Sequence, residues 1–199
     1  MALPTVGQAA LIADEFGRLL EQYQPLSVCV LGCAGGNGLD RVQGTRVRRL
    51  VAVDINPEYA ATTLARYQGH IVGLEVVVAD AESDAVAFQA VDLWFAALLF
   101  EYVDLRHSLQ FVRRHSRPGA MLAALLQLPN AAMGQITPSP YASLQELDRI
   151  MRLISPSELR QRAAEAGFHH RDSKTVSASG GKSFAMEVFQ LGAVDTHGR

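Results

Sequence analysis

A short apolar run that ends in a cluster of glycines is the feature that most constrains the fold of this 199-residue chain. The run is LSVCVL, from Leu26 to Leu31, and the glycines are Gly32, Gly35, Gly36 and Gly38. Its length and its β-branched residues are typical of a buried strand, and glycines directly after a strand allow a ligand to approach the backbone closely. In open α/β sheets, ligands bind at the carboxyl ends of the parallel strands. The pattern therefore predicts an α/β fold with a ligand-binding loop.

The alternation of strand and helix continues along the chain. Asn56 and Pro57 supply an N-cap and a first-turn proline, so a helix is predicted directly after the second strand. An amphipathic helix over residues 8–23, which Pro25 stops, precedes the first strand, and another helix is expected after the glycine loop. Such alternation implies a parallel sheet that is covered on both faces. The other strands are predicted at 49–54, 71–78, 91–99 and 120–128, and the other helices at 57–68, 82–88 and 104–116.

The last third of the chain has a different character. Residues 129–142 contain three prolines and a glycine, and a helical segment is expected over 143–153, which together form an insertion. Ser155 to Glu158 is a capping box that opens a helix ending at Gly167, and two alternating strands follow as an antiparallel hairpin. We therefore predict one domain, a Rossmann-like three-layer αβα sandwich whose seven-stranded sheet is mostly parallel. Its parts are the N-terminal helix (1–25), the βα units (26–128), the insertion (129–153), and the terminal helix with strands 168–177 and 183–191.

Composition excludes several classes of function. The 18 Lys and Arg residues against 20 Asp and Glu give a net charge of -2, which provides no overall field for nucleic acid or anionic membrane. No apolar stretch approaches the roughly 18 residues of a membrane span, and the first 20 residues do not resemble a secretory signal. We expect a cytoplasmic protein with no nucleic-acid or membrane partner; a homodimer is left open. The one basic cluster, Arg41, Arg46, Arg48 and Arg49, lacks interleaved aromatic residues and is interpreted as a solvated face.

Neither cysteine pairing nor a metal site is expected. Cys29 and Cys33 are four residues apart, so in an extended strand their side chains are roughly 13 Å apart, too far for a disulfide. Their spacing also does not match a zinc site, and no histidine has a cysteine or carboxylate at ligand spacing.

Asp54, at the end of the second strand, lies 22 positions after Gly32. This is close to the roughly 20-residue offset at which a carboxylate accepts both ribose hydroxyls of a bound nucleoside. The alternative is a tight turn beside a surface aspartate. A dinucleotide needs glycines in the register G-x-G-x-x-G, but here that register gives Gly32, Ala34 and Asn37, so a smaller adenosine-containing ligand fits better.

These motifs resemble, in order and spacing over about residues 26–191, those of the class I methyltransferases that use S-adenosylmethionine. Where that family has Gly-x-Gly-x-Gly, this sequence has Gly32-Cys33-Ala34-Gly35-Gly36-Asn37-Gly38. The family's turn before the fifth strand corresponds to Arg117-Pro118-Gly119, and its reversed seventh strand corresponds to the hairpin. By resemblance, Asp54 holds the ribose, Ile55 lies beside the adenine and Asp80 accepts the adenine amino group. The cofactor residues that the resemblance implies are Gly32, Cys33, Ala34, Gly36, Asn37, Gly38, Asp54, Ile55, Asn56, Asp80, Ala81, Leu98 and Leu99.

Two departures from the family pattern keep other functions open. Val30 stands where the family often has an acidic residue, and Ala34 replaces the middle glycine. A non-catalytic protein of this fold that binds S-adenosylmethionine is therefore one alternative, and a nicotinamide-dependent oxidoreductase is another.

The main hypothesis is methyl transfer to a small-molecule acceptor. Because the methyl donor is already activated, catalysis needs mostly alignment and desolvation. Glu101 follows the fourth strand and is the candidate base, with Tyr102 beside it as an acceptor contact; the alternative is an exposed glutamate at a helix start with a packing tyrosine. The N-terminal helix and the insertion are the expected substrate walls, with Tyr23, Met133 and Tyr141 as candidate contacts.

Overall fold

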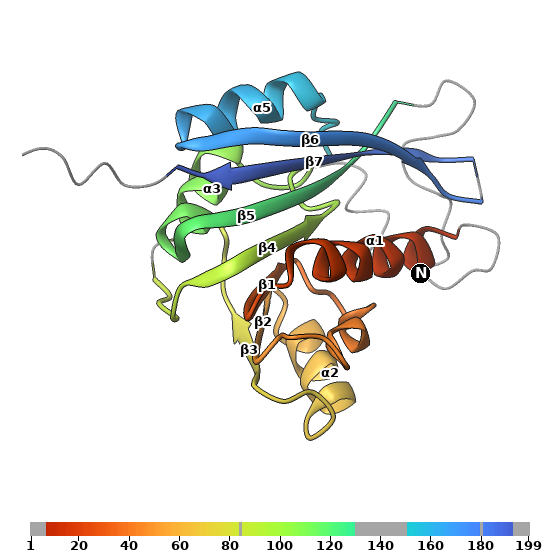
Figure 1. The fold of residues 1–199 in the computed structure, drawn as a ribbon, viewed down its shortest axis with the longest axis vertical. Coiled ribbons are helices and arrows are strands. Elements are labelled where there is room, and N and C mark those ends of the chain that lie inside the picture. Colours follow the sequence, from red (N-terminus) through yellow and green to blue (C-terminus); the bar gives the residue numbers. More distant parts are fainter. Residues whose placement is uncertain (1–6, 84, 130–150, 180, 193–199) are drawn as a thin grey trace, which may run out of the picture.

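A computed structural model describes residues 7–83, 85–129, 151–179 and 181–192, and it contains one seven-stranded sheet (Figure 1). The strands are β1 (Ser27–Leu31), β2 (Arg49–Asp54), β3 (Leu74–Val78), β4 (Val91–Ala97), β5 (Ser116–Gln127), β6 (Phe168–Ser177) and β7 (Ser183–Leu191). Their order across the sheet is β3-β2-β1-β4-β5-β7-β6. Strands β1 to β5 pair in parallel, whereas β7 is antiparallel to both β5 and β6. The predicted fold class is confirmed, including the terminal hairpin.

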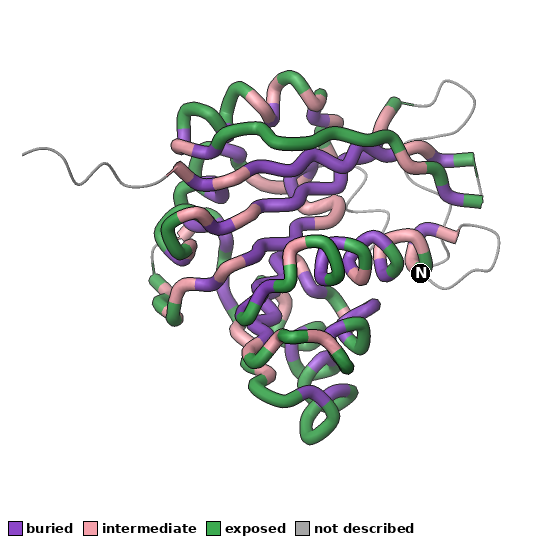
Figure 2. Tube along the Cα trace, viewed as in Figure 1, coloured by how far each residue is buried: buried purple, intermediate pink, exposed green. Residues whose placement is uncertain are grey.

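Helices cover both faces of the sheet, and the buried residues lie between these layers (Figure 2). On one face, Phe16 of α1 stacks on Phe95 of β4 with ring centroids 5.1 Å apart. On the other face, Phe111 of α3 meets Trp94 edge-on at 6.1 Å. The helices are α1 (Gln8–Tyr23), α2 (Pro57–Tyr67), α3 (Leu105–Arg114) and α5 (Pro156–Glu165), with a 3-10 helix η1 (Leu39–Val42).

Two helix starts confirm the capping signals in the sequence. The Asn56 side chain accepts a hydrogen bond from the Glu58 N–H at 2.8 Å and begins α2. The Ser155 hydroxyl accepts one from the Glu158 N–H at 3.1 Å and begins α5. In both helices a side-chain oxygen thus satisfies an N–H group that the helix itself leaves unpaired.

Two predicted helices are wrong. The helix expected after the glycine loop is only the four-residue η1. No helix forms over the described residues of 82–88, because Val86 and Phe88 pack against the core and the Phe88 ring stacks on His115 at 4.4 Å. Of the helix expected over 143–153, only residues 151–153 are described, and they are not helical.

The fifth strand begins at Ser116 rather than at residue 120. Arg117-Pro118-Gly119 therefore lies within β5 instead of forming a turn before it. The pairing register of β4 with β5 shifts between Val91 and Leu93, which accommodates Pro118 and the left-handed Gly119 in the ladder.

Candidate active site

The glycine loop packs between helices α1 and α2 at the carboxyl end of β1. Gly36 and Gly38 have φ angles of 78° and 79°, which favour glycine. A Cβ atom on Gly38 would lie 2.8 Å from the Ala13 Cα of α1, and one on Gly36 would lie 2.7 Å from the Tyr67 Cε2 of α2. The Tyr67 hydroxyl also donates to the Gly36 carbonyl at 2.8 Å. Helix packing thus fixes the shape of the loop without a ligand.

Asp54 links this loop to the end of β2. Its Oδ2 accepts a hydrogen bond from the Ala34 N–H at 2.7 Å, and its Oδ1 accepts one from the Asn56 N–H at 2.9 Å. The residue is 8% exposed. Each carboxylate oxygen offers two lone-pair positions, so each keeps one for a ligand. This arrangement fits the two neighbouring hydroxyls of a ribose.

The loops after β2 and β3 leave the same edge of the sheet. Ile55 is 66% exposed, so its side chain is accessible at this edge. The Ala79 N–H donates to the Asp54 carbonyl at 3.0 Å and so joins the two loops. Asp80 is exposed and accepts the Glu82 N–H at 2.9 Å, while Ala81 is buried.

The exit of β4 reaches the glycine loop. A Cβ on Gly32 would lie 3.1 Å from Leu99 Cδ1, so the two loops are in contact at this point. Leu98 has φ 56°, which is strained for a leucine, and its N–H donates to the Leu125 carbonyl of β5 at 2.8 Å. Strained backbone is therefore held at the edge where the resemblance places the cofactor.

Glu101 lies just beyond this strained turn and is buried, at 2% exposure. Its Oε1 accepts the Gln127 N–H at 2.7 Å, and its Oε2 has no hydrogen-bond partner within the described ranges. Burial raises the pKa of Glu101 to about 7. Asp104, not Glu101, caps α3 by accepting the His107 N–H at 2.9 Å. The alternative of an exposed helix-start glutamate is wrong.

The structure gives other candidate residues different surroundings. Tyr23 is the last residue of α1, beside the start of β1, and so lies at the end of the sheet opposite the glycine loop. The Asn37 side chain donates to the Ala9 carbonyl of α1 at 2.8 Å, which ties it to the helix. Tyr102 is half-buried, and its N–H donates to the Leu99 carbonyl at 2.9 Å. Met133 and Tyr141 lie outside the described residues.

Both cysteines are free and buried. Burial raises the pKa of the Cys33 thiol to about 11 and that of Cys29 also well above its usual range. Cys33 is therefore a packing residue of the loop rather than a reactive thiolate.

Two further residues near Glu101 were not predicted from the sequence. Gln127 ends β5 and holds Glu101 through its N–H. Lys182, in the β6–β7 turn, is only 5% exposed, and its Nζ lies 3.4 Å from the Gln127 side-chain oxygen. Burial lowers the pKa of Lys182. Lysine in a glycine-rich turn is usually a solvent-exposed residue, so no sequence signal marked it.

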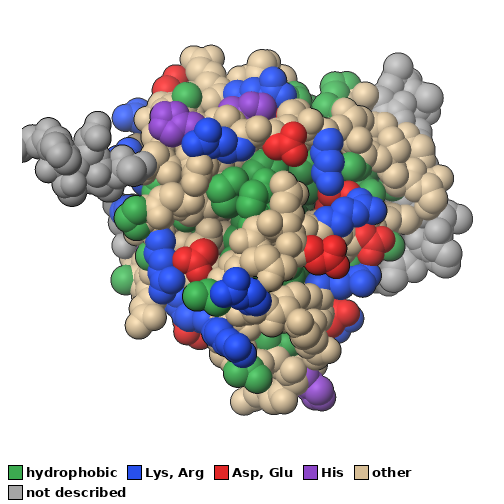
Figure 3. Space-filling view, viewed as in Figure 1, with side chains coloured by type: hydrophobic (Ala, Val, Ile, Leu, Met, Phe, Trp, Pro, Cys, Tyr) green, Lys and Arg blue, Asp and Glu red, His purple; other side chains and the backbone are tan. Residues whose placement is uncertain are grey.

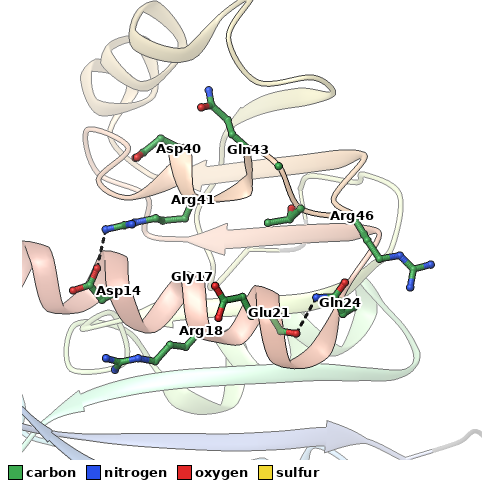
Figure 4. A pocket seen from close by; sticks show the side chains of 11 residues that line it. Asp14, Gly17, Arg18, Glu21, Gln24, Asp40, Arg41, Gln43 and Arg46 are labelled. Atoms are coloured by element: carbon green, nitrogen blue, oxygen red, sulfur yellow. Dashed lines mark hydrogen bonds and ion pairs between the residues drawn. The ribbon is translucent and has the colours of Figure 1, made fainter.

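A groove of about 740 Å³ lies elsewhere, between α1 and the segment that carries η1 (Figure 4). It is lined by charges of both signs, including Arg41, which is paired with Asp14 at 2.7 Å. None of the predicted site residues lines it. The face in Figure 3 likewise shows Lys and Arg interspersed with Asp and Glu.

In the described part of the chain, no group of His, Cys, Asp and Glu side chains is suited to hold a metal ion. Over the same residues, no helix combines the length and the apolar character needed to cross a membrane.

Comparison with known proteins identifies relatives of this domain. The family model "Methyltransferase domain" matches residues 29–124. The malonyl-[acyl-carrier protein] O-methyltransferase of Dechloromonas aromatica (strain RCB) is 29% identical over 182 residues, which cover 87% of this chain and 64% of that protein. The chain therefore spans less than two thirds of the length of this curated relative.

Solved structures share the fold at low sequence identity. The N-methyltransferase NodS from Bradyrhizobium japonicum WM9, in complex with S-adenosyl-L-homocysteine, has a TM-score of 0.65 and 13% identity over 90% of this chain and 87% of its own. The [4+2]-cyclase SpnF has a TM-score of 0.69 and 15% identity over 91% and 82%. The chain is thus similar to methyltransferases over residues 29–124, where most of the predicted motifs lie, and it shares its fold with these solved structures.

Proposed function

We propose that this protein binds S-adenosylmethionine and transfers its methyl group to a small-molecule acceptor. The observation that carries the proposal is the Asp54 carboxylate, which the Ala34 and Asn56 N–H groups hold at the glycine loop with one lone pair left on each oxygen. Ile55 and Asp80 would contact the adenine. The cofactor supplies a methyl group on a positively charged sulfur, which needs no further activation.

The chain's own contribution is alignment and exclusion of water. The helix-packed glycine loop fixes one wall of the site, and the contact of Leu99 with Gly32 brings the β4 exit against it. Leu98 and Leu99 are apolar and half-buried, so they would exclude water beside the methyl group.

The short η1 supports this proposal over a nicotinamide-dependent oxidoreductase. A dinucleotide fold places the pyrophosphate at the N-terminus of the α-helix that follows the glycine loop, where free N–H groups and the helix dipole stabilise it. Here that position holds a four-residue 3-10 helix whose first turn contains Asp40. S-adenosylmethionine has no pyrophosphate and does not need such a helix.

The proposed acceptor is a small molecule. One relative is named for O-methylation of malonyl-[acyl-carrier protein] and one solved structure for N-methylation, and neither name indicates a nucleic-acid acceptor. Paired basic residues argue against a nucleic-acid acceptor: Arg41 binds Asp14, and Arg49 binds Glu75 at 2.7 Å. The proposed setting is the cytoplasm, as the composition predicts.

Calorimetric titration with S-adenosylmethionine, S-adenosylhomocysteine and NAD tests the cofactor. We expect the first two to bind and NAD not to bind. Asp54→Ala should weaken binding by about 1 to 3 kcal/mol because charge-assisted contacts to the ribose are lost. Asp172→Ala, on the exposed strand β6, is the control and should bind normally. Absence of S-adenosylmethionine binding by the unmodified protein would overturn the proposal.

Asp54 also binds two backbone N–H groups, so its replacement can disturb the loop. Asp54→Asn retains an oxygen that can accept one of these bonds, and its thermal unfolding should stay closer to that of the wild type. If Asp54→Asn unfolds like the wild type yet binds the cofactor weakly, the lost affinity belongs to the ribose contact rather than to loop collapse.

A further inference from the structure

The free oxygen of Glu101 bears on which acceptors the site takes. Resting on the proposed methyl transfer, we infer that Oε2 of Glu101 accepts a proton from the acceptor, and that the acceptor is therefore a hydroxyl or amine compound rather than a carboxylate. The curated relative is named for methylation on malonyl-[acyl-carrier protein], so this inference separates the present chain from it.

Glu101 is fixed from two sides. Its Oε1 accepts the Gln127 N–H of β5 at 2.7 Å, and its own carbonyl accepts the Arg152 N–H at 2.8 Å. The first bond orients the carboxyl group at the carboxyl end of β5, and the second ties its backbone to the chain that returns from the insertion. Both bonds favour the buried position of the side chain.

Oε2 is the part of this group that packing does not explain. Its atom is buried, and no donor within the described residues contacts it. Buried polar atoms are nearly always hydrogen-bonded, and an ionised carboxylate pays a large desolvation cost without a donor. Glu101 comes three residues after the strained Leu98 and two after Leu99, which touches the glycine loop. An O–H or N–H of an acceptor at this edge would supply the missing donor.

The transfer then balances without another reactant. The acceptor's lone pair forms the new bond to the methyl carbon, and the carbon–sulfur bond breaks with its electron pair remaining on sulfur. The proton of the acceptor O–H or N–H passes to Oε2 of Glu101, which returns it to water after the products leave. A carboxylate acceptor releases no proton, and its charge would be repelled by ionised Glu101.

Among the residues that the structure describes, the charged groups near Glu101 do not supply a substitute donor. The Arg152 guanidinium is paired with Glu158 at 2.8 Å. Lys182 reaches the side-chain oxygen of Gln127, whereas Glu101 binds the N–H of that residue. Burial raises the pKa of Glu101 to about 7, which suits a group that must give up and regain a proton near neutral pH.

The first test observes Glu101 without any cofactor. An infrared difference spectrum between the wild type and Glu101→Gln isolates the carbonyl band of the protonated carboxyl group, which should vanish with a midpoint near pH 7. A midpoint near the ordinary value of 4.5 would show a solvated carboxylate and would overturn the inference, whatever acceptors are found.

The second test offers amines, phenols, alcohols and carboxylates to the protein with S-adenosylmethionine. We expect methylation only of N–H or O–H acceptors, with kcat rising as the pH increases through about 7. Glu101→Gln should lower kcat at least about 100-fold and leave S-adenosylmethionine affinity within twofold by calorimetry. Glu165→Gln, an exposed glutamate of α5, is the control and should retain the wild-type kcat.

Two results would contradict the inference. One is methylation of a carboxylate at a rate that falls as pH rises. Glu101 would then be a protonated hydrogen-bond donor that holds the acceptor, and the amide group of Glu101→Gln could take over that role. The other is unchanged turnover in Glu101→Gln. If instead S-adenosylmethionine does not bind the wild type, the proposed function fails, and the infrared titration still decides the state of Glu101.

Discussion

Replacing Glu101 by glutamine should change how the stability of the protein depends on pH. The folded-state pKa is raised to about 7 from the ordinary value of 4.5, so the folded protein binds more protons than the unfolded chain between these values. Wild-type stability should therefore fall as pH rises from 4.5 through 7. Because the side chain is only 2% exposed, solvent does not screen this effect. A shift of this size corresponds to about 3 kcal/mol.

Glutamine has nearly the same shape, keeps an oxygen for the Gln127 N–H and does not ionise. The free energy of unfolding of Glu101→Gln minus that of the wild type should thus increase by about 3 kcal/mol between pH 4.5 and pH 8. Urea unfolding at several pH values measures it, with Glu21→Gln on the exposed side of α1 as the control. Parallel pH profiles for the wild type and Glu101→Gln would refute the reasoning, because they would show that Glu101 ionises in the folded state as easily as in the unfolded chain.

Further predictions concern the glycine loop and the outer strands. Gly38 and Gly44 both have left-handed φ angles, but a Cβ on Gly38 meets Ala13 of α1 whereas one on Gly44 meets nothing within 4 Å. Gly44→Ala should therefore lower the free energy of unfolding by about 1 to 2 kcal/mol, and Gly38→Ala should lower it by about 2 to 5 kcal/mol. Urea unfolding measures both losses, and equal losses would contradict the packing of the loop on α1. The carboxylate of Glu187 is fully buried, and Arg160 binds it with two nitrogens. Glu187→Gln removes this charge and should lower the free energy of unfolding by about 2 to 4 kcal/mol. Glu165→Gln breaks an exposed ion pair and should lower it by less than about 1 kcal/mol. Similar losses in these two variants would show that burial does not set the strength of the pair.

Local signals in the sequence predicted most elements of the fold. Asn56 and Ser155 were readable because a cap needs only a short polar side chain and a helix-compatible segment after it. The run from Leu26 to Leu31 was readable because a strand buried on both faces is apolar throughout. Asp54 followed from its distance to the glycine loop, and the structure brings the two together through the Ala34 N–H.

The errors arose where distant contacts decide local structure. Residues 82–88 contain helix-compatible residues, but Phe88 gains more by stacking on His115, 27 positions further along the chain, than a short helix could provide. Burial of Lys182 depends on Gln127 from another strand, which no local pattern encodes. Tyr23 was misplaced because a helix that leads into β1 must end at the amino edge of a parallel sheet, so only its first turns can reach the site.

The departure of Ala34 from the family pattern does not weaken the loop in the way that the sequence alone suggested. Ala34 adopts φ 46°, the left-handed conformation of the glycine that it replaces, at a cost of about 1 to 2 kcal/mol for a residue with a Cβ. Two hydrogen bonds hold Ala34 there: its N–H donates to Asp54 at 2.7 Å, and its carbonyl accepts the Thr63 hydroxyl at 2.8 Å. Asp54 is itself held by the Asn56 N–H. Its methyl group lies on an exposed residue and so does not strain the packed side of the loop. The protein therefore maintains the glycine-like backbone by contacts with β2 and α2, which leaves the Asp54 oxygens in place for a ligand.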